Sequence, residues 1–386
     1  MRTKALVIDR PGADFTYRDI DVDENIRATE VLVQIVASGV CRTDLDFSQN
    51  DIEGMFPAVL GHEGAGIISQ VGSKVSDLQV GDRVVLGYTS CGECKYCLRN
   101  QTSFCGDWEI DNFGIGRGGD GSKAYAFPAD EGAGEKAEAA EGADEMEITS
   151  HFFGQSSFSK FAVADARCCI KVGEPGDDVD LPSLAPLGCG ILSGAGAMLN
   201  VINPSAEDIV CVVGAGSVGL AAVMALNFLK DKPKQIIVVD VIEERLKLAK
   251  KYGATHVVNP STERDLPGAL KRITNFEGLD ASIDATGRIE ILRDLLEATA
   301  KLGTVCSLDS EVSINVFNAV NSGRKYVGCC MGNVYPPEFV PKLIQGWKDG
   351  IFPFTDLIKR YSAEEMELAK SEMLDGTTVK AVLVWD

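Results

Sequence analysis

Hydrophobic and polar positions follow two different rhythms along the chain. Up to about residue 90, short β-type runs alternate with glycine-containing turns, a pattern that predicts an antiparallel, barrel-like lobe. From residue 209 to about residue 330, apolar strand-like runs alternate with helical stretches such as residues 243–252, which Gly253 ends. This second rhythm predicts a doubly wound parallel sheet with helices on both faces. The expected fold class is therefore α/β, with an antiparallel, β-barrel-like domain as a second part.

The last stretch of the chain loses this rhythm. From about Gly332 it has proline-containing turns, an amphipathic helical pattern near residues 363–373 and a final strand-like run at residues 379–384. We expect it to rejoin the first lobe. The predicted division is a first domain at residues 1–190, a second at 191–331, and a C-terminal part of the first at 332–386.

Residues 209–240 predict a dinucleotide site, because they read as strand, tight turn, helix and second strand. Gly214, Gly216 and Gly219 have the spacing G-x-G-x-x-G, in which the first permits the turn, the second lets a pyrophosphate approach the backbone and the third lets the helix lie close to the sheet. Asp240 ends the second strand, where a carboxylate binds the adenosine ribose and repels a 2′-phosphate. The interpretation is a Rossmann domain that prefers NAD; a glycine-rich turn in another α/β protein is the alternative.

A cysteine-rich loop, CGECKYCLRNQTSFC, predicts a metal site. Cys91, Cys94, Cys97 and Cys105 have the spacing C-x2-C-x2-C-x7-C, which can close a tetrahedral shell of four thiolates around a structural zinc. An iron-sulfur cluster or a redox pair are the alternatives, although iron-sulfur runs differ in the fourth spacing. The zinc would help to fold a lobe at about residues 90–106 that is too small for a core of its own.

Charge and composition exclude some classes of partner. The chain has 386 residues, 57 acidic against 37 basic side chains and a net charge of -20, which argues against a nucleic-acid or anionic-membrane partner. We read no signal pattern or apolar run of spanning length, so a cytoplasmic location is expected, and twelve cysteines then suit metal ligation and packing better than disulfides. An acidic stretch at about residues 129–147 is interpreted as a solvated surface insertion; a docking patch or a flap over the active site is the alternative.

Three further residues complete a resemblance to a known family. Cys41 stands in GVCRTDLD, His62 in GHEGAG, and Cys189 between two glycines. With the cysteine loop and the nucleotide motif in this order, the chain resembles the zinc-containing medium-chain alcohol dehydrogenases over nearly its whole length. GVCRTDLD and HFFGQSSFSKF are most similar to the aryl- or benzyl-alcohol dehydrogenase branch.

The resemblance implies a GroES-like catalytic domain, one catalytic and one structural zinc per chain, and NAD. Cys41, His62 and Cys189 would ligate the catalytic zinc and leave one position open. By the same resemblance Asp44 orients the histidine, Glu63 lies behind the metal and Thr43 accepts the alcohol proton. Arg42 and Lys380 would contact the cofactor pyrophosphate, and Arg245 would help to hold the adenosine ribose. The family also implies a homodimer or homotetramer.

The chain departs from the family pattern at three positions. Asp46 occupies the place where many members end the proton relay with a histidine, so the relay exit is expected at Asp46, the ribose hydroxyl or water. Gly87, next to Tyr88, replaces a bulky aromatic residue, and Asp309 stands where the family has a glycine-containing turn. A pocket widened at Gly87 and lined by Phe152 and Phe153 would favour bulky or aromatic alcohols.

The predicted function is that of an NAD-dependent zinc alcohol dehydrogenase that interconverts a bulky or aromatic primary alcohol and its aldehyde. Enzyme alternatives are a reductase of a specialised metabolite carbonyl, a glutathione-dependent formaldehyde dehydrogenase and a zinc-free quinone or enoyl reductase. The zinc-free reading is disfavoured by the three retained ligands. A catalytically dead binding protein of the same fold is the non-enzyme alternative.

Overall fold

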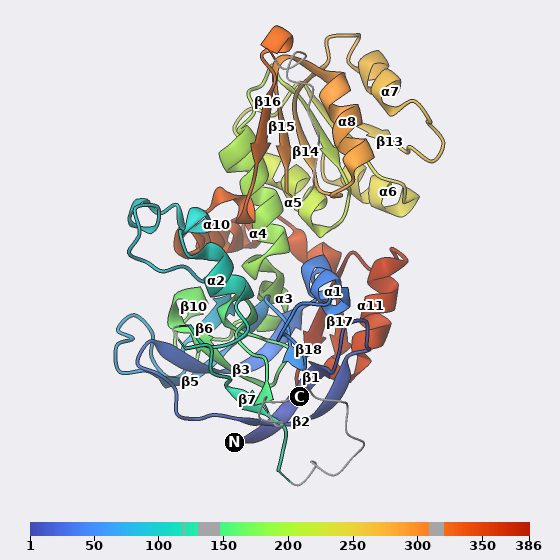
Figure 1. Ribbon diagram of the computed structural model, residues 1–386. Coiled ribbons are helices and arrows are strands. Elements are labelled where there is room, and N and C mark those ends of the chain that lie inside the picture. Colours follow the sequence, from blue (N-terminus) through green and yellow to red (C-terminus); the bar gives the residue numbers. More distant parts are fainter. Residues whose placement is uncertain (119, 130–146, 309–319) are drawn as a thin grey trace. The chain divides into compact units, whose positions relative to one another are not determined.

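The structure is a computed structural model that describes residues 1–118, 120–129, 147–308 and 320–386 (Figure 1). The predictions on Asp309 and on most of the acidic stretch therefore fall outside the described residues. The chain divides into two compact units. Unit 1 contains Met1–Cys189, Pro336–Pro341 and Leu357–Asp386; unit 2 contains Gly190–Tyr335 and Lys342–Asp356.

The C-terminal part of the chain is shared between the two units, whereas the sequence pattern predicts that all of residues 332–386 join the first domain. Residues 332–335 and 342–356 belong to unit 2. For residues 342–356 the reason is aromatic packing within unit 2: the Phe228 and Phe352 rings lie 5.6 Å apart, and a Cβ on Gly346 would meet the Phe228 ring at 2.3 Å. A close approach of this kind needs glycine.

Unit 1 contains two sheets. The five-stranded sheet has the order β4-β1-β2-β7-β8, and its pairs are antiparallel. The seven-stranded sheet has the order β10-β6-β5-β3-β18-β17, with β9 also pairing with β3, and only β17 and β18 are parallel. The bounds are β1 Arg2–Ile8, β2 Thr16–Val22, β3 Glu30–Gly39, β4 Ala58–Val59, β5 Gly64–Val71, β6 Arg83–Leu86, β7 Tyr125–Ala126, β8 Glu147–Ile148, β9 Phe161–Asp165, β10 Cys169–Gly173, β17 Ile358–Ser362 and β18 Lys380–Val384.

Alternation in β2 shows how the sequence specifies these sheets. Ile20 and Val22 are buried, whereas Asp19 and Asp21 point to the other face, where they pair with Lys4 and Arg2 of β1. Successive side chains of a strand point to opposite faces, so one face enters the core and the other meets water. The α-helices of unit 1 are α1 Arg42–Gln49, α2 Trp108–Phe113, α3 Leu181–Leu184 and α11 Met366–Leu374, and α10 Pro336–Lys348 contributes its first turns.

Unit 2 is built on a six-stranded parallel sheet with the order β13-β12-β11-β14-β15-β16. This is the doubly wound order, and the direction of winding reverses between β11 and β14, where such sheets bind ligands at the carboxyl ends of the strands. The bounds are β11 Ile209–Val213, β12 Gln235–Val239, β13 His256–Val258, β14 Leu279–Asp284, β15 Thr299–Ser307 and β16 Lys325–Gly328, with α4 Gly190–Gly196, α5 Ser217–Ala225, α6 Glu243–Lys251, α7 Leu266–Ile273 and α8 Ile289–Ala298.

Both faces of this sheet are covered, which explains the continuous apolar runs. All five residues of β11 are buried. Its residues Ile209, Cys211 and Val213 belong to one core cluster with α7 and α8, and Val212 lies against Gly219 of α5 on the other face. The predicted fold class is confirmed. Among the described residues no single helix is long and apolar enough to cross a membrane, although residues 181–188 and 190–202, a bent pair, reach that length together.

Candidate active site

Asp44 joins two of the predicted ligands. It lies in the first turn of α1, and its Oδ2 accepts the N–H of Cys41, the residue that caps this helix, at 2.9 Å. Its Oδ1 lies 2.8 Å from Nδ1 of His62 and accepts the N–H of Gly61 at 3.1 Å. Asp44 and His62 are both fully buried. A carboxylate on Nδ1 directs Nε2 to a metal, and Nε2 has no hydrogen-bond partner among the described residues.

Four potential ligand atoms converge at this point. Those of Cys41, His62, Glu63 and Cys189 lie within 4.8 Å of one another, although the residues come from distant parts of the sequence. The hydrogen bond with Cys189 holds the pKa of the Cys41 thiol well below its usual range. Burial opposes this shift, and the neighbouring His62 supports it. The same hydrogen bond and burial raise the pKa of Cys189. Two sulfurs and an imidazole nitrogen without a partner form a donor set that fits zinc.

Glu63 is paired with Lys380 beside these ligands. Lys380 Nζ lies 2.6 Å from Glu63 Oε2 and 2.8 Å from Oε1, and it donates to the carbonyl of Val40 at 2.9 Å. Both side chains are buried, and burial raises the pKa of Glu63 to about 7 although Lys380 opposes the shift. A Cβ on Gly39 would lie 2.1 Å from Glu63 Oε2, so this position needs glycine. The contact of Lys380 with the cofactor stays a prediction; in unit 1 its ammonium binds Glu63.

The other predicted residues of α1 lie on its more exposed side. Arg42 Nε donates to Asp46 Oδ1 at 2.8 Å, one helical turn away. The two side chains are 72% and 45% exposed, so the ion pair itself adds little stability. Thr43 Oγ1 accepts from the Cys41 thiol at 3.8 Å, which places the hydroxyl beside a ligand.

Aromatic rings surround the imidazole of His62. The Phe153 ring is stacked on it at 4.4 Å, and the Phe152 ring meets it edge-on at 5.6 Å. Further rings, which the sequence interpretation missed, extend this cluster from α1 and α2: Phe47 5.0 Å from Phe152, Phe113 5.2 Å from Phe153 and Trp108 6.5 Å from Phe153. No pattern in the linear sequence shows that these helices meet. The available signal was the aromatic character of Phe47, which follows GVCRTDLD, and of Trp108 and Phe113 in α2.

Gly87 and Tyr88 have packing partners of their own. Tyr88 shares a hydrogen bond with Thr102 Oγ1 at 2.7 Å, and its ring meets Trp108 at 4.7 Å. A Cβ on Gly87 would lie 3.2 Å from the carbonyl oxygen of Gly188, the residue before Cys189. Gly87 thus faces the backbone next to a predicted ligand. The wider pocket at Gly87 stays a prediction.

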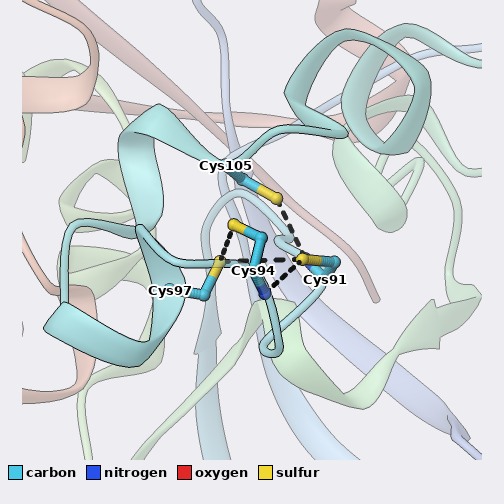
Figure 2. Close-up of side chains that lie close together, drawn as sticks. All are labelled: Cys91, Cys94, Cys97 and Cys105. Carbon is cyan, nitrogen blue, oxygen red and sulfur yellow. Dashed lines mark hydrogen bonds between the residues drawn. The ribbon is translucent and has the colours of Figure 1, made fainter.

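The four cysteines of the second predicted metal site also converge (Figure 2). Their sulfur atoms lie within 4.8 Å of one another, with 3.6 Å between those of Cys94 and Cys97 and 3.9 Å between those of Cys91 and Cys97. Backbone N–H groups donate to the sulfurs of Cys91 and Cys105 at 3.4 and 3.2 Å. Backbone N–H groups also lower the pKa of Cys94 to about 6, whereas burial raises the pKa of Cys105 to about 12. Four sulfurs in a closed group match a structural zinc site.

The glycine motif of unit 2 has the backbone that a dinucleotide requires. Gly214 has a φ of 91° in the turn after β11, in the left-handed region. A Cβ on Gly219 would lie 1.7 Å from the carbonyl oxygen of Gly214, so α5 can begin here only with glycine. Gly216 caps α5, and nothing lies within 4 Å of the place where its Cβ would be. This open side and the N–H groups of α5 fit a pyrophosphate.

Asp240 holds this turn together from the end of β12. Its Oδ2 accepts the N–H of Ala215 at 2.6 Å, and its Oδ1 accepts that of Ile242 at 2.8 Å. It is 8% exposed, so the carboxylate is placed firmly beside the glycine turn. Arg245 is half-buried on α6, and its Nε has no hydrogen-bond partner among the described residues. Both residues can serve an adenosine ribose.

Together, a doubly wound unit with a nucleotide-binding motif and a β-rich unit with two thiol-containing groups that could hold a metal match the make-up of a metal- and dinucleotide-dependent dehydrogenase. Comparisons with known proteins agree. Residues 27–133 match the family model "Alcohol dehydrogenase GroES-like domain", and residues 217–346 match "Zinc-binding dehydrogenase".

Relatives resemble the chain over nearly their full length. Geraniol dehydrogenase from Castellaniella defragrans is 33% identical over 93% of this chain and 91% of its own. S-(hydroxymethyl)glutathione dehydrogenase from Komagataella pastoris is 32% identical over 99% of this chain and 97% of its own. The crystal structure of benzyl alcohol dehydrogenase from Acinetobacter calcoaceticus matches with a TM-score of 0.88 and 33% identity, and each chain is covered in full, 100%.

The protein therefore belongs to the zinc-containing medium-chain alcohol dehydrogenase family, as the sequence predicted. It is an oxidoreductase of the alcohol dehydrogenase type, with zinc and NAD as its cofactors.

Proposed function

We propose that this enzyme interconverts bulky, apolar primary alcohols, aromatic ones foremost, and their aldehydes with NAD. The observation that carries this proposal is the aromatic packing on His62, with Phe153 at 4.4 Å and Phe152 at 5.6 Å. A hydrocarbon substrate bound close to His62 would contact these rings, and aromatic pairs add about 0.5–1.5 kcal/mol beyond the area that they bury. Ethanol is too small to gain much from them.

The proposed catalytic metal ligands are Cys41, His62 and Cys189. When bound, zinc supplies a Lewis acid for the alcohol oxygen, and NAD supplies a hydride acceptor. Asp44 keeps Nδ1 of His62 occupied, so Nε2 would be the nitrogen that holds the metal. The buried pair of Glu63 and Lys380 places a carboxylate next to the ligands without an uncompensated charge.

Thr43 is the proposed acceptor of the alcohol proton. Its hydroxyl lies beside the Cys41 sulfur and can both accept and donate a proton. Asp46 lies three residues later on the same helix face and is exposed, so it is the proposed exit to solvent. Arg42, Lys380, Arg245 and the glycine motif are proposed to hold NAD, and Cys91, Cys94, Cys97 and Cys105 the structural zinc.

The second candidate substrate is a hydroxymethylated thiol such as S-(hydroxymethyl)glutathione, since relatives carry that name. A glutathione adduct bears carboxylates, whereas the described rings around His62 come from Phe and Trp side chains that offer no positive charge. This observation favours the apolar alcohol.

The test is steady-state kcat/KM for benzyl alcohol, geraniol, ethanol and S-(hydroxymethyl)glutathione, with NAD and NADP, on protein of measured zinc content. We expect two zinc ions per chain, preference for NAD and an advantage for benzyl alcohol over ethanol. Turnover restricted to short aliphatic alcohols, or to the glutathione adduct, would refute the substrate class. No turnover of any of them would favour a binding protein.

Oligomeric state and location are further proposals. The family implies a homodimer or homotetramer, which sedimentation can measure. A cytoplasmic location is proposed because clusters of free thiols suited to zinc are typical of reducing compartments.

A further inference from the structure

A short segment after β8 runs alongside the chain that carries His62. We call residues 151–158 the strap. Three of its residues donate hydrogen bonds to the backbone carbonyls of residues 59–61: Ser156 Oγ to Val59 O at 2.7 Å, Phe158 N to Leu60 O at 3.0 Å and Ser157 N to Gly61 O at 2.9 Å. The strap is therefore fastened to the segment that leads into the ligand.

Gln155 extends this attachment past His62. Its side chain is fully buried. Oε1 accepts the N–H of Gly64 at 3.0 Å, and Nε2 donates to the carbonyl of His62 at 3.0 Å and to that of Gly87 at 2.6 Å. Two carbonyls and one N–H allow only one orientation of the amide. The side chain thus joins the backbone on either side of Glu63 to the end of β6.

The Gly87 end of this bridge lies beside Cys189. A Cβ on Gly188 would lie 2.1 Å from the carbonyl oxygen of Leu86 and 3.5 Å from Cα of Gly87. The chain just before Cys189 is therefore in direct backbone contact with the chain that accepts from Gln155. One buried amide spans the segments of two proposed ligands.

The backbone of the strap is strained where it passes His62. Left-handed φ angles occur at three non-glycine residues, His151 (69°), Phe153 (55°) and Ser156 (48°), and at Gly154 (71°), where they cost little. A bulky residue with positive φ is an outlier, and such strain persists only where the surroundings over-determine it, commonly at functional sites. The result of this conformation is that Phe153 lays its ring on the imidazole of His62.

We propose that Gln155 is a positioning residue for the catalytic zinc site: it sets the separation of His62 and Cys189 and so determines how tightly the site holds its metal. The inference rests on the proposed ligand set. Gln155 touches neither substrate nor cofactor in this role. It acts through the backbone of the ligand segments.

The test is Gln155→Glu, which keeps the size of the side chain and the acceptor for Gly64. The oxygen that replaces Nε2 would face the carbonyls of His62 and Gly87, which repel it. We expect the catalytic zinc to bind roughly 10- to 100-fold more weakly, the range found for groups that support metal ligands. Release of zinc to a chelator should show one fast and one unchanged phase, because the four-cysteine site is an internal reference.

Two further variants and a second readout sharpen the experiment. Gln155→Leu removes all three hydrogen bonds without adding charge, in case a buried carboxylate prevents folding. Ser159→Ala removes a hydrogen bond to Phe161 just beyond the strap, 2.7 Å long, and serves as the control. In cobalt-substituted protein, the visible absorption of the catalytic site should change in both Gln155 variants and not in the control.

The outcomes separate the positioning role from the proposed function. Wild-type protein with only the four-cysteine zinc would refute the ligand set itself. Wild-type protein with two zinc ions, but Gln155 variants that release both at wild-type rates with an unchanged cobalt spectrum, would refute the role of Gln155 alone. Faster release from both sites in parallel, or failure of both Gln155 variants to fold where Ser159→Ala folds, would also overturn it in favour of a purely structural role.

Discussion

The carboxylate of Asp44 lies 2.8 Å from Nδ1 of His62, and both side chains are fully buried. Asp44 also accepts the N–H of Cys41, so a single carboxylate connects two proposed metal ligands. Burial favours the neutral ring, yet the charges of Asp44 and Cys41 raise the pKa of His62. A zinc ion in place of the proton would receive the same electrostatic support.

Asp44→Asn should therefore weaken the catalytic zinc selectively. The variant keeps the shape of the side chain and loses its charge, and we expect zinc affinity and kcat/KM to fall roughly 10- to 100-fold. Zinc content after dialysis against a chelator measures the first effect. Asp46→Asn removes the same charge from the exposed side of α1 and should keep both zinc ions. Equal zinc loss in the two variants would contradict the role of Asp44.

Cys97→Ser should remove the structural zinc and leave the catalytic one. Cys97 is buried and its sulfur contacts those of Cys91 and Cys94, so an oxygen there opens the four-sulfur group. Because a structural zinc contributes folding free energy directly, we expect the zinc content to fall from two to one per chain and Tm to decrease. Cys169→Ser changes a half-buried cysteine outside both sites and should retain two zinc ions.

Asp240→Asn should reduce the preference for NAD over NADP. The carboxylate orders the turn through Ala215, which an amide oxygen can still do, but its charge repels a 2′-phosphate. Like-charge contacts cost several kcal/mol, so the ratio of kcat/KM for NAD and NADP should fall by at least about tenfold. An unchanged ratio would show that the ribose does not lie beside Asp240.

The buried carboxylate of Glu30, which is not a predicted metal ligand, should make the stability of the fold depend on pH. Burial alone would raise its pKa, but the His151 imidazole 3.7 Å away, a hydrogen bond from the Arg27 N–H and the charge of Arg117 hold the pKa below its usual value. The lowered pKa means that this carboxylate stabilises the fold fully above the unfolded-state pKa of about 4.3, and that its contribution is lost as the pH falls toward the folded value.

Urea unfolding at several pH values between about 3 and 7 tests this sign. The free energy of unfolding of wild-type protein should decrease below about pH 4.3 more steeply than that of Glu30→Gln. Because both proteins lose zinc in acid, their difference isolates Glu30. Glu53→Gln removes a charge at an exposed position and should follow the wild type.

Local sequence patterns were enough to predict most residues of the candidate site, whereas the remaining residues come together only through tertiary packing. The glycine spacing, Asp240 and the four cysteines could be recognised because their chemistry depends on neighbours in sequence. Phe47, Trp108 and Phe113 could not, because α1 and α2 meet the strap only in the folded chain. The partner of Lys380 was missed for the same reason, since Glu63 lies 317 residues away in sequence. Residues 342–356 join unit 2 through the aromatic contact with Phe228. This contact could not be predicted, because the segment lies outside the alternating strand and helix pattern.

Phe113 offers a test of the substrate class that leaves the metal site untouched. It contacts Phe153 at 5.2 Å and Phe47 at 5.1 Å, and it is 36% exposed, so its ring borders the aromatic cluster without contacting His62. Phe113→Ala should lower kcat/KM for benzyl alcohol by roughly tenfold, since apolar contacts of this size discriminate between substrates by about 1–3 kcal/mol. The kcat/KM for ethanol should change little. Phe276→Ala, an aromatic residue of unit 2 that is 77% exposed, is the control and should change neither. An equal loss for both alcohols would mean that Phe113 supports the fold and not the substrate, and the aromatic cluster would then lose its place in the specificity argument.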